Sequence, residues 1–194
     1  MTTTPIETTT GKDVPRAIAV MVLAFSADPI MRWLYPEPHA YLTQFPNFVR
    51  KFAGKAFDQG TAYHTEGFTG AALWRPPGVE PDKKEVVTLL QRTVPKALQS
   101  QVFSVFERAS HYRPNEPYWH LSLIGVEASR QHSGLGSGLM EDVLAPCDRD
   151  KKFAYLNASN PKQIPFYERH GFEVLDTIQV ASSPPLFPML RKPR

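Results

Sequence analysis

The 194-residue sequence predicts a single domain of the α/β (α+β) class. Its length and its hydrophobic content of 42% suit one domain with a full core. Segments with strand and helix patterns alternate along the chain, and many of the 19 prolines mark where these segments end. Residues 124–140, IGVEASRQHSGLGSGLM, run from an apolar strand through a glycine-rich turn into an amphipathic helix.

The elements of the N-terminal half follow from local signals. Asp13 suits a helix N-cap, and Pro15 suits the first turn of that helix. Gly67 separates two β-rich segments in the manner of a hairpin. The expected elements are a strand at 6–10, a helix that begins at Asp13, a helical region at 37–59 interrupted by Pro46, strands at 61–66 and 68–74, and a long helix at about 84–111 that bends near Pro95.

In the C-terminal half, strands and helices alternate up to a closing pair of strands. Gly171 suits the end of the last helix because glycine adopts the left-handed conformation of a helix C-terminus. The expected elements are a strand at 119–126, a helix at 134–147, a strand at 153–159, a helix at 161–170 and strands at 172–180 and 186–190.

Composition argues against several classes of protein. The single cysteine, Cys147, rules out an internal disulfide and suits a reducing compartment, so we expect a cytoplasmic location. No apolar run approaches the roughly 18 residues of a membrane helix, and the Thr-rich residues 1–10 read as a partly flexible N-terminus rather than a signal peptide. The net charge of +3 comes from scattered side chains, so neither nucleic acid nor membrane is an expected partner. We expect no metal site, and a monomer or homodimer.

The glycine-rich turn is suited to hold a phosphate or pyrophosphate. Gly134, Gly136 and Gly138 expose the backbone where a helix begins, and the helix dipole adds positive potential there. A Walker loop needs Lys and then Ser or Thr after its last glycine, but Leu139 and Met140 stand there. A dinucleotide-binding turn needs a third glycine at the position of Leu139 and an acidic residue about 20 positions on, where the chain reads AYLNASNP. Both nucleotide-binding classes are therefore excluded.

Another spacing fits a known family. The turn reads Gln131-x-x-Gly134-x-Gly136, and further on Asn160 lies seven residues before Tyr167 in NPKQIPFYERHGF. With these two motifs in this order, the chain resembles the GNAT family of N-acetyltransferases. From about residue 113 on, it looks most like the branch that includes puromycin N-acetyltransferase. The resemblance implies one GNAT domain over residues 1–194, with a central mixed, mostly antiparallel sheet of about seven strands, flanked by helices and splayed between the fourth and fifth strands.

The same resemblance implies a site for coenzyme A, with acetyl-CoA as the acetyl donor. The family binds the pyrophosphate through backbone N–H groups of the turn, and the N–H of Val126 is the implied donor to the thioester oxygen. A basic residue usually precedes the first glycine, but His132 and Ser133 stand there. We therefore expect backbone amides and serine hydroxyls to bind the pyrophosphate. Asn160 is implied as a contact of the pantetheine arm, and it also suits a helix N-cap. The implied cofactor-binding residues are Ile124, Val126, Gln131, His132, Ser133, Gly134, Leu135, Gly136, Ser137, Asn160 and Tyr167.

Tyr167 is the implied catalytic acid. A phenol with its reference pKa of about 10 stays protonated at neutral pH and donates to a departing thiolate. The general base is open. His120 could accept the proton of the amine directly or through water. Asn157 stands where many relatives carry Glu, and an amide orients water but takes no proton, which favours a water relay. Simple packing is the alternative for both Tyr167 and His120.

The N-terminal half is expected to shape the acceptor site, because aromatic and charged residues cluster near its loops. The candidates are Asp28, Trp33, Tyr35, Trp74, Arg75, Trp119 and Asn157, and each tryptophan suits the core equally well. The sequence thus predicts transfer of an acetyl group from acetyl-CoA to a primary amine of a small molecule or peptide, by direct attack in a ternary complex. The alternative is a catalytically silent acyl-CoA-binding sensor or regulatory module, because Asn157 and the pair His132-Ser133 depart from the family pattern.

Overall fold

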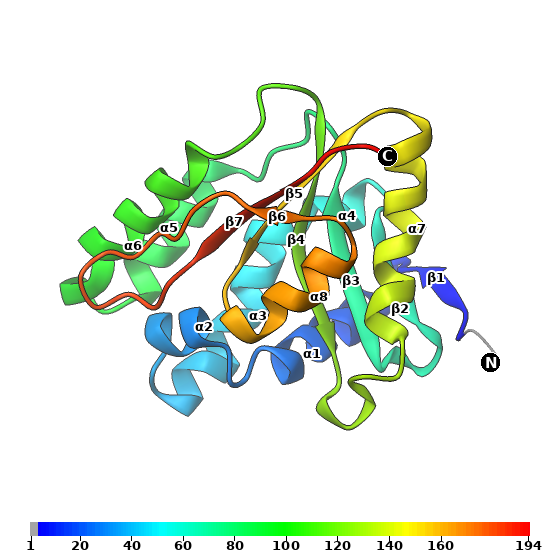
Figure 1. The fold of residues 1–194 in the computed structure, drawn as a ribbon. Helices are drawn as coiled ribbons and strands as arrows, with labels where there is room; N and C mark the ends of the chain where they lie inside the picture. Colours follow the sequence, from blue (N-terminus) through cyan, green and yellow to red (C-terminus); the bar gives the residue numbers. More distant parts are fainter. Residues whose placement is uncertain (1–3) are drawn as a thin grey trace.

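The computed structural model describes residues 4–194, which form a seven-stranded sheet with helices on both faces (Figure 1). The strands are β1 (Ile6–Thr8), β2 (Ala62–Thr65), β3 (Gly70–Arg75), β4 (Tyr118–Val126), β5 (Phe153–Ala158), β6 (Glu173–Val174) and β7 (Phe187–Arg191). The α-helices are α1 (Val14–Ala24), α2 (Pro29–Leu34), α3 (Pro38–Ala53), α4 (Lys55–Asp58), α5 (Lys83–Thr93), α6 (Lys96–Ser110), α7 (Leu135–Arg149) and α8 (Ile164–Arg169). Short 3₁₀ turns are η1 (Gly11–Asp13), η2 (Glu66–Phe68), η3 (Ala128–Arg130) and η4 (Pro161–Gln163).

The strand order is β1-β2-β3-β4-β5-β7-β6, and all neighbours are antiparallel except β4 and β5. This confirms the predicted mixed, mostly antiparallel sheet. The helix expected at 84–111 is instead two helices. Pro95 has no N–H and holds Val94 in an extended conformation, with ψ of 140°, so α5 ends there and α6 begins anew. The strand expected at 172–180 is reduced to β6 and one isolated bridge.

The N-terminal region holds one expected strand and one helix that was not expected. The strand expected at 6–10 is β1, in which Ile6–Thr8 pair with β2, and the flexibility expected for residues 1–10 concerns in part residues 1–3, outside the described residues. The helix α2 was not predicted. Asp28 caps it by accepting a hydrogen bond from the Met31 N–H at 3.0 Å, and Pro29 occupies its first position.

Two hydrophobic cores lie on opposite faces of the sheet. Helices α1 and α3 pack on β3 and β4 on one face, and α7 crosses β1 to β5 on the other (Figure 1). The first core, here the α1 core, gathers side chains from α1, α2, α3, α5 and α6. The second, the α7 core, gathers side chains from α7, α8 and the strands between them. A Cβ on Gly125 of β4 would lie 2.5 Å from the Cβ of Ala24 in α1, so this close contact requires glycine.

A β-bulge in β4 decides which side chains face each core. Leu73 of β3 pairs with Leu123, whereas the next residue, Trp74, pairs with Leu121, so Ser122 has no partner on β3. Leu121 consequently packs in the α7 core and Leu123 in the α1 core, although residues two apart in a regular strand face the same side.

Strands β4 and β5 separate at the bulge. They pair only over Tyr118–Leu121 and Phe153–Leu156. The rest of β4, residues 122–126, has no pairing with β5, so its outward-facing backbone groups border an opening that we call the strand gap. The predicted splay between the fourth and fifth strands is this gap.

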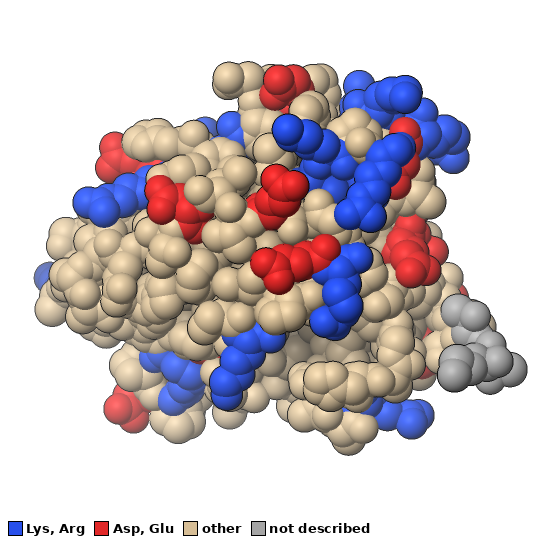
Figure 2. All heavy atoms as spheres, viewed as in Figure 1, with Lys and Arg blue, Asp and Glu red and all other residues tan. Residues whose placement is uncertain are grey.

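Charged side chains of both signs are interspersed on the face seen in Figure 2, and basic ones gather at its upper right. Within residues 4–194, none of the helices is long and apolar enough to cross a membrane.

A bidentate ion pair ties β7 to the end of α7. Arg191, 4% exposed, donates from Nη1 and Nη2 to the two carboxylate oxygens of Asp148, both at 2.7 Å. The same guanidinium donates from Nε to the carbonyl oxygen of His170 after α8, at 2.8 Å. One buried group thus links two helices and a strand, and its hydrogen bond lowers the pKa of Asp148.

We expect Asp148→Asn to lower the free energy of unfolding by about 2–3 kcal/mol at pH 7, because it leaves the Arg191 cation buried without a counter-ion. A carboxyl with a lowered folded-state pKa stabilises above its unfolded pKa of about 3.9 and loses this effect as pH falls through the folded pKa. The difference between variant and wild type should therefore shrink below about pH 4. Urea unfolding at several pH values measures it. Asp150→Asn, which breaks only the exposed pair with Arg149, should change stability by less than about 0.5 kcal/mol.

Candidate active site

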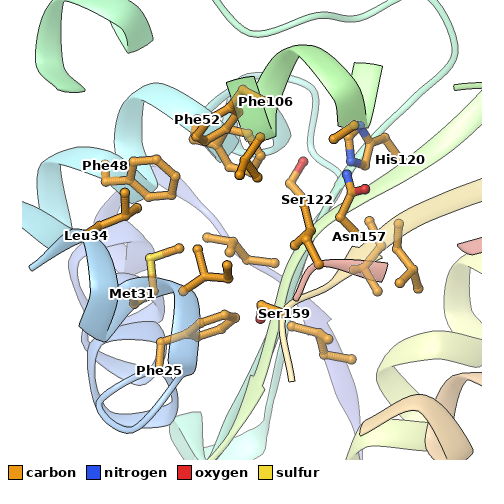
Figure 3. A pocket seen from close by; sticks show the side chains of 18 of the residues that line it. Phe25, Met31, Leu34, Phe48, Phe52, Phe106, His120, Ser122, Asn157 and Ser159 are labelled. Carbon is orange, nitrogen blue, oxygen red and sulfur yellow. The ribbon is translucent and has the colours of Figure 1, made fainter. Parts of the chain in front are cut away.

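A cavity of about 100 Å³ lies between the strand gap and helices α1, α2, α3 and α6 (Figure 3). The helical side is apolar and carries Phe25, Met31 and Phe106 among others. The strand side is polar where Ser122 of β4 and Asn157 of β5 line it. The bulge creates this polar side, because it allows His120, Ser122 and Leu123 of one strand all to line the cavity.

A cluster of Arg75, Glu80 and Arg113 lies beside the polar strand side of the cavity, which we call the polar wall. Arg75 of β3 is 0% exposed, and its Nε donates to Ser122 Oγ at 2.9 Å. The carboxylate of Glu80 lies 3.4 Å from Nη1 of Arg75 and 2.9 Å from Nη1 of Arg113. Two guanidinium groups share one carboxylate, so the cluster keeps a net positive charge beside the cavity.

Arg75 also fixes the state of His120. Its Nη2 donates to Nδ1 of His120, since a guanidinium has no acceptor. The neutral imidazole must then carry its hydrogen on Nε2. Burial first, and then the charges of Arg75 and Arg113, hold the pKa of His120 well below its usual value of about 6.5. His120 is therefore a neutral hydrogen-bond donor at physiological pH, and its one lone pair is already used.

The amide of Asn157 is held from β5. The hydroxyl of Tyr155, a fully buried residue, lies 3.0 Å from Asn157 Oδ1 and 3.1 Å from the Ala109 carbonyl oxygen of α6. The Nδ2 of Asn157 has no hydrogen bond within the described part of the chain, so this donor is available to a ligand or water in the cavity.

Tyr167 of α8 reaches the cavity at the strand gap. The residue is 5% exposed and packs in the α7 core beside Phe166 and Phe172, yet it also lines the cavity. Burial, and then the negative charge of Asp28, raise the pKa of Tyr167. Its phenol is thus protonated across the neutral range.

The glycine-rich turn presents free backbone donors at the start of α7. Within residues 4–194, the N–H groups of Leu135, Gly136 and Ser137 have no acceptor, as expected in the first turn of a 15-residue helix. Gly134 caps the helix with φ of +87°, a conformation that favours glycine. A Cβ on Gly136 would lie 3.2 Å from the ring of Phe166, so a larger residue would push α7 away from α8.

Backbone donors of β4 face the strand gap. The Glu127 N–H donates to the Thr69 carbonyl oxygen on the β3 side, at 2.8 Å. Alternation along the strand turns the N–H groups of Val126 and Ile124 to the opposite side, toward the gap. Together with the free N–H groups of α7, these donors fit the extended arm and pyrophosphate of coenzyme A.

Some side chains of the turn form hydrogen bonds within the protein. Gln131 Nε2 donates to the Val126 carbonyl oxygen at 3.3 Å and closes the loop. The hydroxyl of Ser133 donates to the Arg130 carbonyl oxygen, and that of Ser137 lies 3.2 Å from His170 Nε2. Backbone amides are therefore the freer donors of the turn.

The remaining cofactor candidates have structural explanations too. His132 takes φ of +63° and is exposed, and Asn160 accepts a hydrogen bond from the Lys162 N–H at 3.1 Å as the cap of η4.

The sequence profile of the acetyltransferase (GNAT) domain family matches residues 92–192, just over half of the chain. The chain belongs to the GNAT acetyltransferase family. The matched region holds the strand gap, the glycine-rich turn and Tyr167, so the family features and the geometry coincide.

Known proteins resemble this GNAT chain over its whole length. An uncharacterised N-acetyltransferase of Schizosaccharomyces pombe is 24% identical over 206 residues, covering 94% of this chain and 81% of the relative. A solved structure from Corynebacterium glutamicum, described as histone acetyltransferase HPA2 and related acetyltransferase, has a TM-score of 0.70 at 23% identity and covers 100% of this chain and 98% of its own. Arylalkylamine N-acetyltransferase 2 of Aedes aegypti has a TM-score of 0.69 at 12% identity, with both chains covered completely. The structural likenesses show the fold, and the family gives acetyl transfer as the class of activity.

The acceptor candidates of the GNAT chain fall into two groups. Trp33 and Asn157 line the cavity, and Asp28 lies behind it, where its carboxylate accepts from Ser159 Oγ. Trp74 and Trp119 instead pack in the α7 core on the other face of the sheet.

The remaining acceptor candidate, Tyr35, and the single cysteine, Cys147, also lie away from the cavity. Tyr35 is buried in the α1 core, where its hydroxyl lies 3.1 Å from Thr93 Oγ1. Cys147 is fully buried in the α7 core, and burial raises the pKa of its thiol to about 12, which argues against an acyl-cysteine route.

Sequence reasoning missed several residues in the cavity wall or behind it. Arg113 lines the cavity, Glu80 pairs with it, and Tyr155 supports Asn157, but none of the three was predicted as a site residue. Phe48 and Phe52, which lie in the helical region expected at 37–59, also line the cavity. Their 3.6-residue periodicity gave a signal for burial but none for a ligand.

Proposed function

We propose that this chain transfers the acetyl group of acetyl-CoA to a primary amine of a small molecule or peptide, by direct attack while both are bound. The observation that carries the proposal is the meeting of two sites at the strand gap. The cavity opens there on one face, with Tyr167 in its lining, and the free backbone donors of β4 and α7 lie at the gap and its open end.

Each part of the chain has a role in this proposal. Acetyl-CoA supplies the acetyl group as an activated thioester. The N–H groups of Leu135, Gly136 and Ser137 bind pyrophosphate, and the Val126 N–H polarises the carbonyl oxygen that gains charge in the transition state. Tyr167 holds on Oη the proton that the sulfur needs on release. Asn157 orients the amine and a water beside it, and this water takes the proton that the nitrogen loses as the amide forms.

The test is release of free thiol by the full chain with acetyl-CoA and a panel of amines, which includes a peptide with a free N-terminus. The resemblance to the puromycin branch adds puromycin to the panel. We expect thiol release that depends on an amine, with the N-acetylated amine found by mass spectrometry. Tight binding of acetyl-CoA without turnover on any amine would instead favour the silent acyl-CoA-binding module.

A further inference from the structure

The apolar side of the cavity is built mainly from aromatic rings. The rings surround the space seen in Figure 3 and belong to Phe25 just after α1, Phe48 and Phe52 of α3, and Phe106 of α6. Phe48 and Phe52 stack at 5.1 Å between ring centroids, and Phe106 meets Phe52 edge to face at 6.3 Å. Aromatic walls of this kind favour a flat apolar guest, because ring edges and faces attract one another beyond simple burial.

The size of the cavity limits such a guest. Its volume is about 100 Å³. An engineered apolar cavity of about 150 Å³ is known to hold benzene. The space is smaller than that cavity, so it takes at most one six-membered ring with a small adjustment of the walls, whereas a fused two-ring system would have to displace them much further.

The charges around the cavity disfavour a second cation on the guest. Within the described residues, the lining contains no Asp or Glu, and its one charged residue is Arg113. The carboxylate of Asp28 already accepts from Ser159 Oγ and the Met31 N–H. Glu80 is held between two guanidinium groups. A second, buried ammonium group would have no carboxylate among the described residues of the cavity lining to pair with, and near Ser122 it would lie beside two guanidinium groups, which is costly.

We propose that the acceptor is an aralkyl monoamine, with one six-membered aromatic ring on a short alkyl chain and no second cationic group. This assignment rests on the proposed function, because it takes the cavity as the acceptor site. The ring lies among the phenylalanines of the helices, and the amine lies at the polar strand wall near Asn157 and Tyr167.

The experiment measures binding and turnover separately. Calorimetry on the full chain saturated with coenzyme A compares 2-phenylethylamine with 1,4-diaminobutane at pH 9, and thiol release with acetyl-CoA compares their kcat/KM. We expect 2-phenylethylamine to bind and react at least about tenfold better, since tenfold corresponds to about 1.4 kcal/mol of preference. Better binding or turnover of the diamine overturns the assignment, and so does failure of 2-phenylethylamine to bind. Binding of 2-phenylethylamine without turnover of any amine would support the assigned ligand class but contradict the proposed acetyl transfer.

Two variants on one helix locate the binding site. Phe106 and Phe103 of α6 are both half-buried against the α1 core, but only Phe106 lines the cavity. Phe106→Ala should weaken 2-phenylethylamine binding about tenfold and leave acetyl-CoA binding unchanged, whereas Phe103→Ala should change amine binding less than about twofold. Phe106→Leu preserves most of the volume and serves if the alanine variant does not fold. Equal effects at the two positions would overturn the assignment.

Discussion

Replacing Tyr167 with Phe is expected to lower kcat for acetyl transfer about 100-fold or more, with little change in the affinity for acetyl-CoA. Positioned proton donors typically contribute about 10²–10⁴-fold to the rate. Tyr167 meets the requirements for such a donor, because it lines the cavity at the strand gap and its raised pKa keeps the phenol protonated. The ring of Phe would keep the contacts with Phe166 and Phe172, so the fold should persist.

Tyr35→Phe is the matched control for this variant. Tyr35 is also a buried tyrosine, but its hydroxyl bonds to Thr93 away from the cavity. Its loss should lower stability by about 1 kcal/mol and leave kcat unchanged. Stopped-flow detection of free thiol gives kcat, and calorimetry gives the affinity for acetyl-CoA. Full activity of Tyr167→Phe would assign Tyr167 to packing alone.

The cofactor side of the site was more predictable from sequence than the acceptor side, for a physical reason. Binding of phosphate at a helix start depends on consecutive residues, so Gly134 and Gly136 carry their signal within a few positions. Tyr167 and Asn160 likewise belong to one short segment. Where function lies in the local backbone, local sequence is informative.

The acceptor side depends on pairing between distant segments. Trp74 and Arg75 are neighbours in β3, and alternation sends Trp74 into the α7 core and Arg75 toward His120 on the other side. Which of the two lies on the cavity side of the sheet depends on the register with β4 and on the bulge at Ser122. A single sequence carries no mark of that bulge. The sequence therefore predicts Trp33, Trp74 and Trp119 equally as acceptor-site residues, although only Trp33 of the three lines the cavity.

One local signal was present and unused. Asp28-Pro29 combines a preferred N-cap residue with proline at the first helical position, and α2 begins there. The helix is only six residues long, so it offers too little periodicity to be recognised from its apolar face.

The second large expected effect is on the pH dependence of acetyl transfer. We expect kcat/KM for 2-phenylethylamine to rise about tenfold per pH unit from about pH 6 to pH 9, without a plateau near 6.5. An alkylammonium group resembles that of lysine, with a pKa of about 10.4, so only about one molecule in 2,500 is the reactive free base at pH 7. No carboxylate lines the cavity within residues 4–194 to take the proton.

The groups around His120 explain why its titration adds no inflection to the pH profile of kcat/KM. Arg75 of β3 donates to its Nδ1, and Arg113 adds a second positive charge. Tyr118 and Tyr155 face it from β4 and β5, with ring centroids 6.2 and 5.4 Å away. With its pKa held well below 6.5, His120 stays neutral through the measured range, so only the amine titrates. A fluorinated phenylethylamine with a lower ammonium pKa should reach its plateau at a correspondingly lower pH.

Variants at two positions distinguish the effect of the Arg75 cation on the pKa of His120 from that of the Glu80 carboxylate. Arg75→Met removes one cation and frees Nδ1, so the pKa of His120 should rise, but burial and Arg113 still hold it below its reference of about 6.5, and a new inflection of the pH profile should appear on the acid side of that value. Arg75→Gln gives the same readout if the methionine variant is unstable. Glu80→Gln keeps both arginines, leaves the pKa of His120 low and should retain the simple slope. If kcat/KM of the wild type instead levelled off from about pH 7, the result would contradict this account, because it would require a protein base that titrates near neutrality.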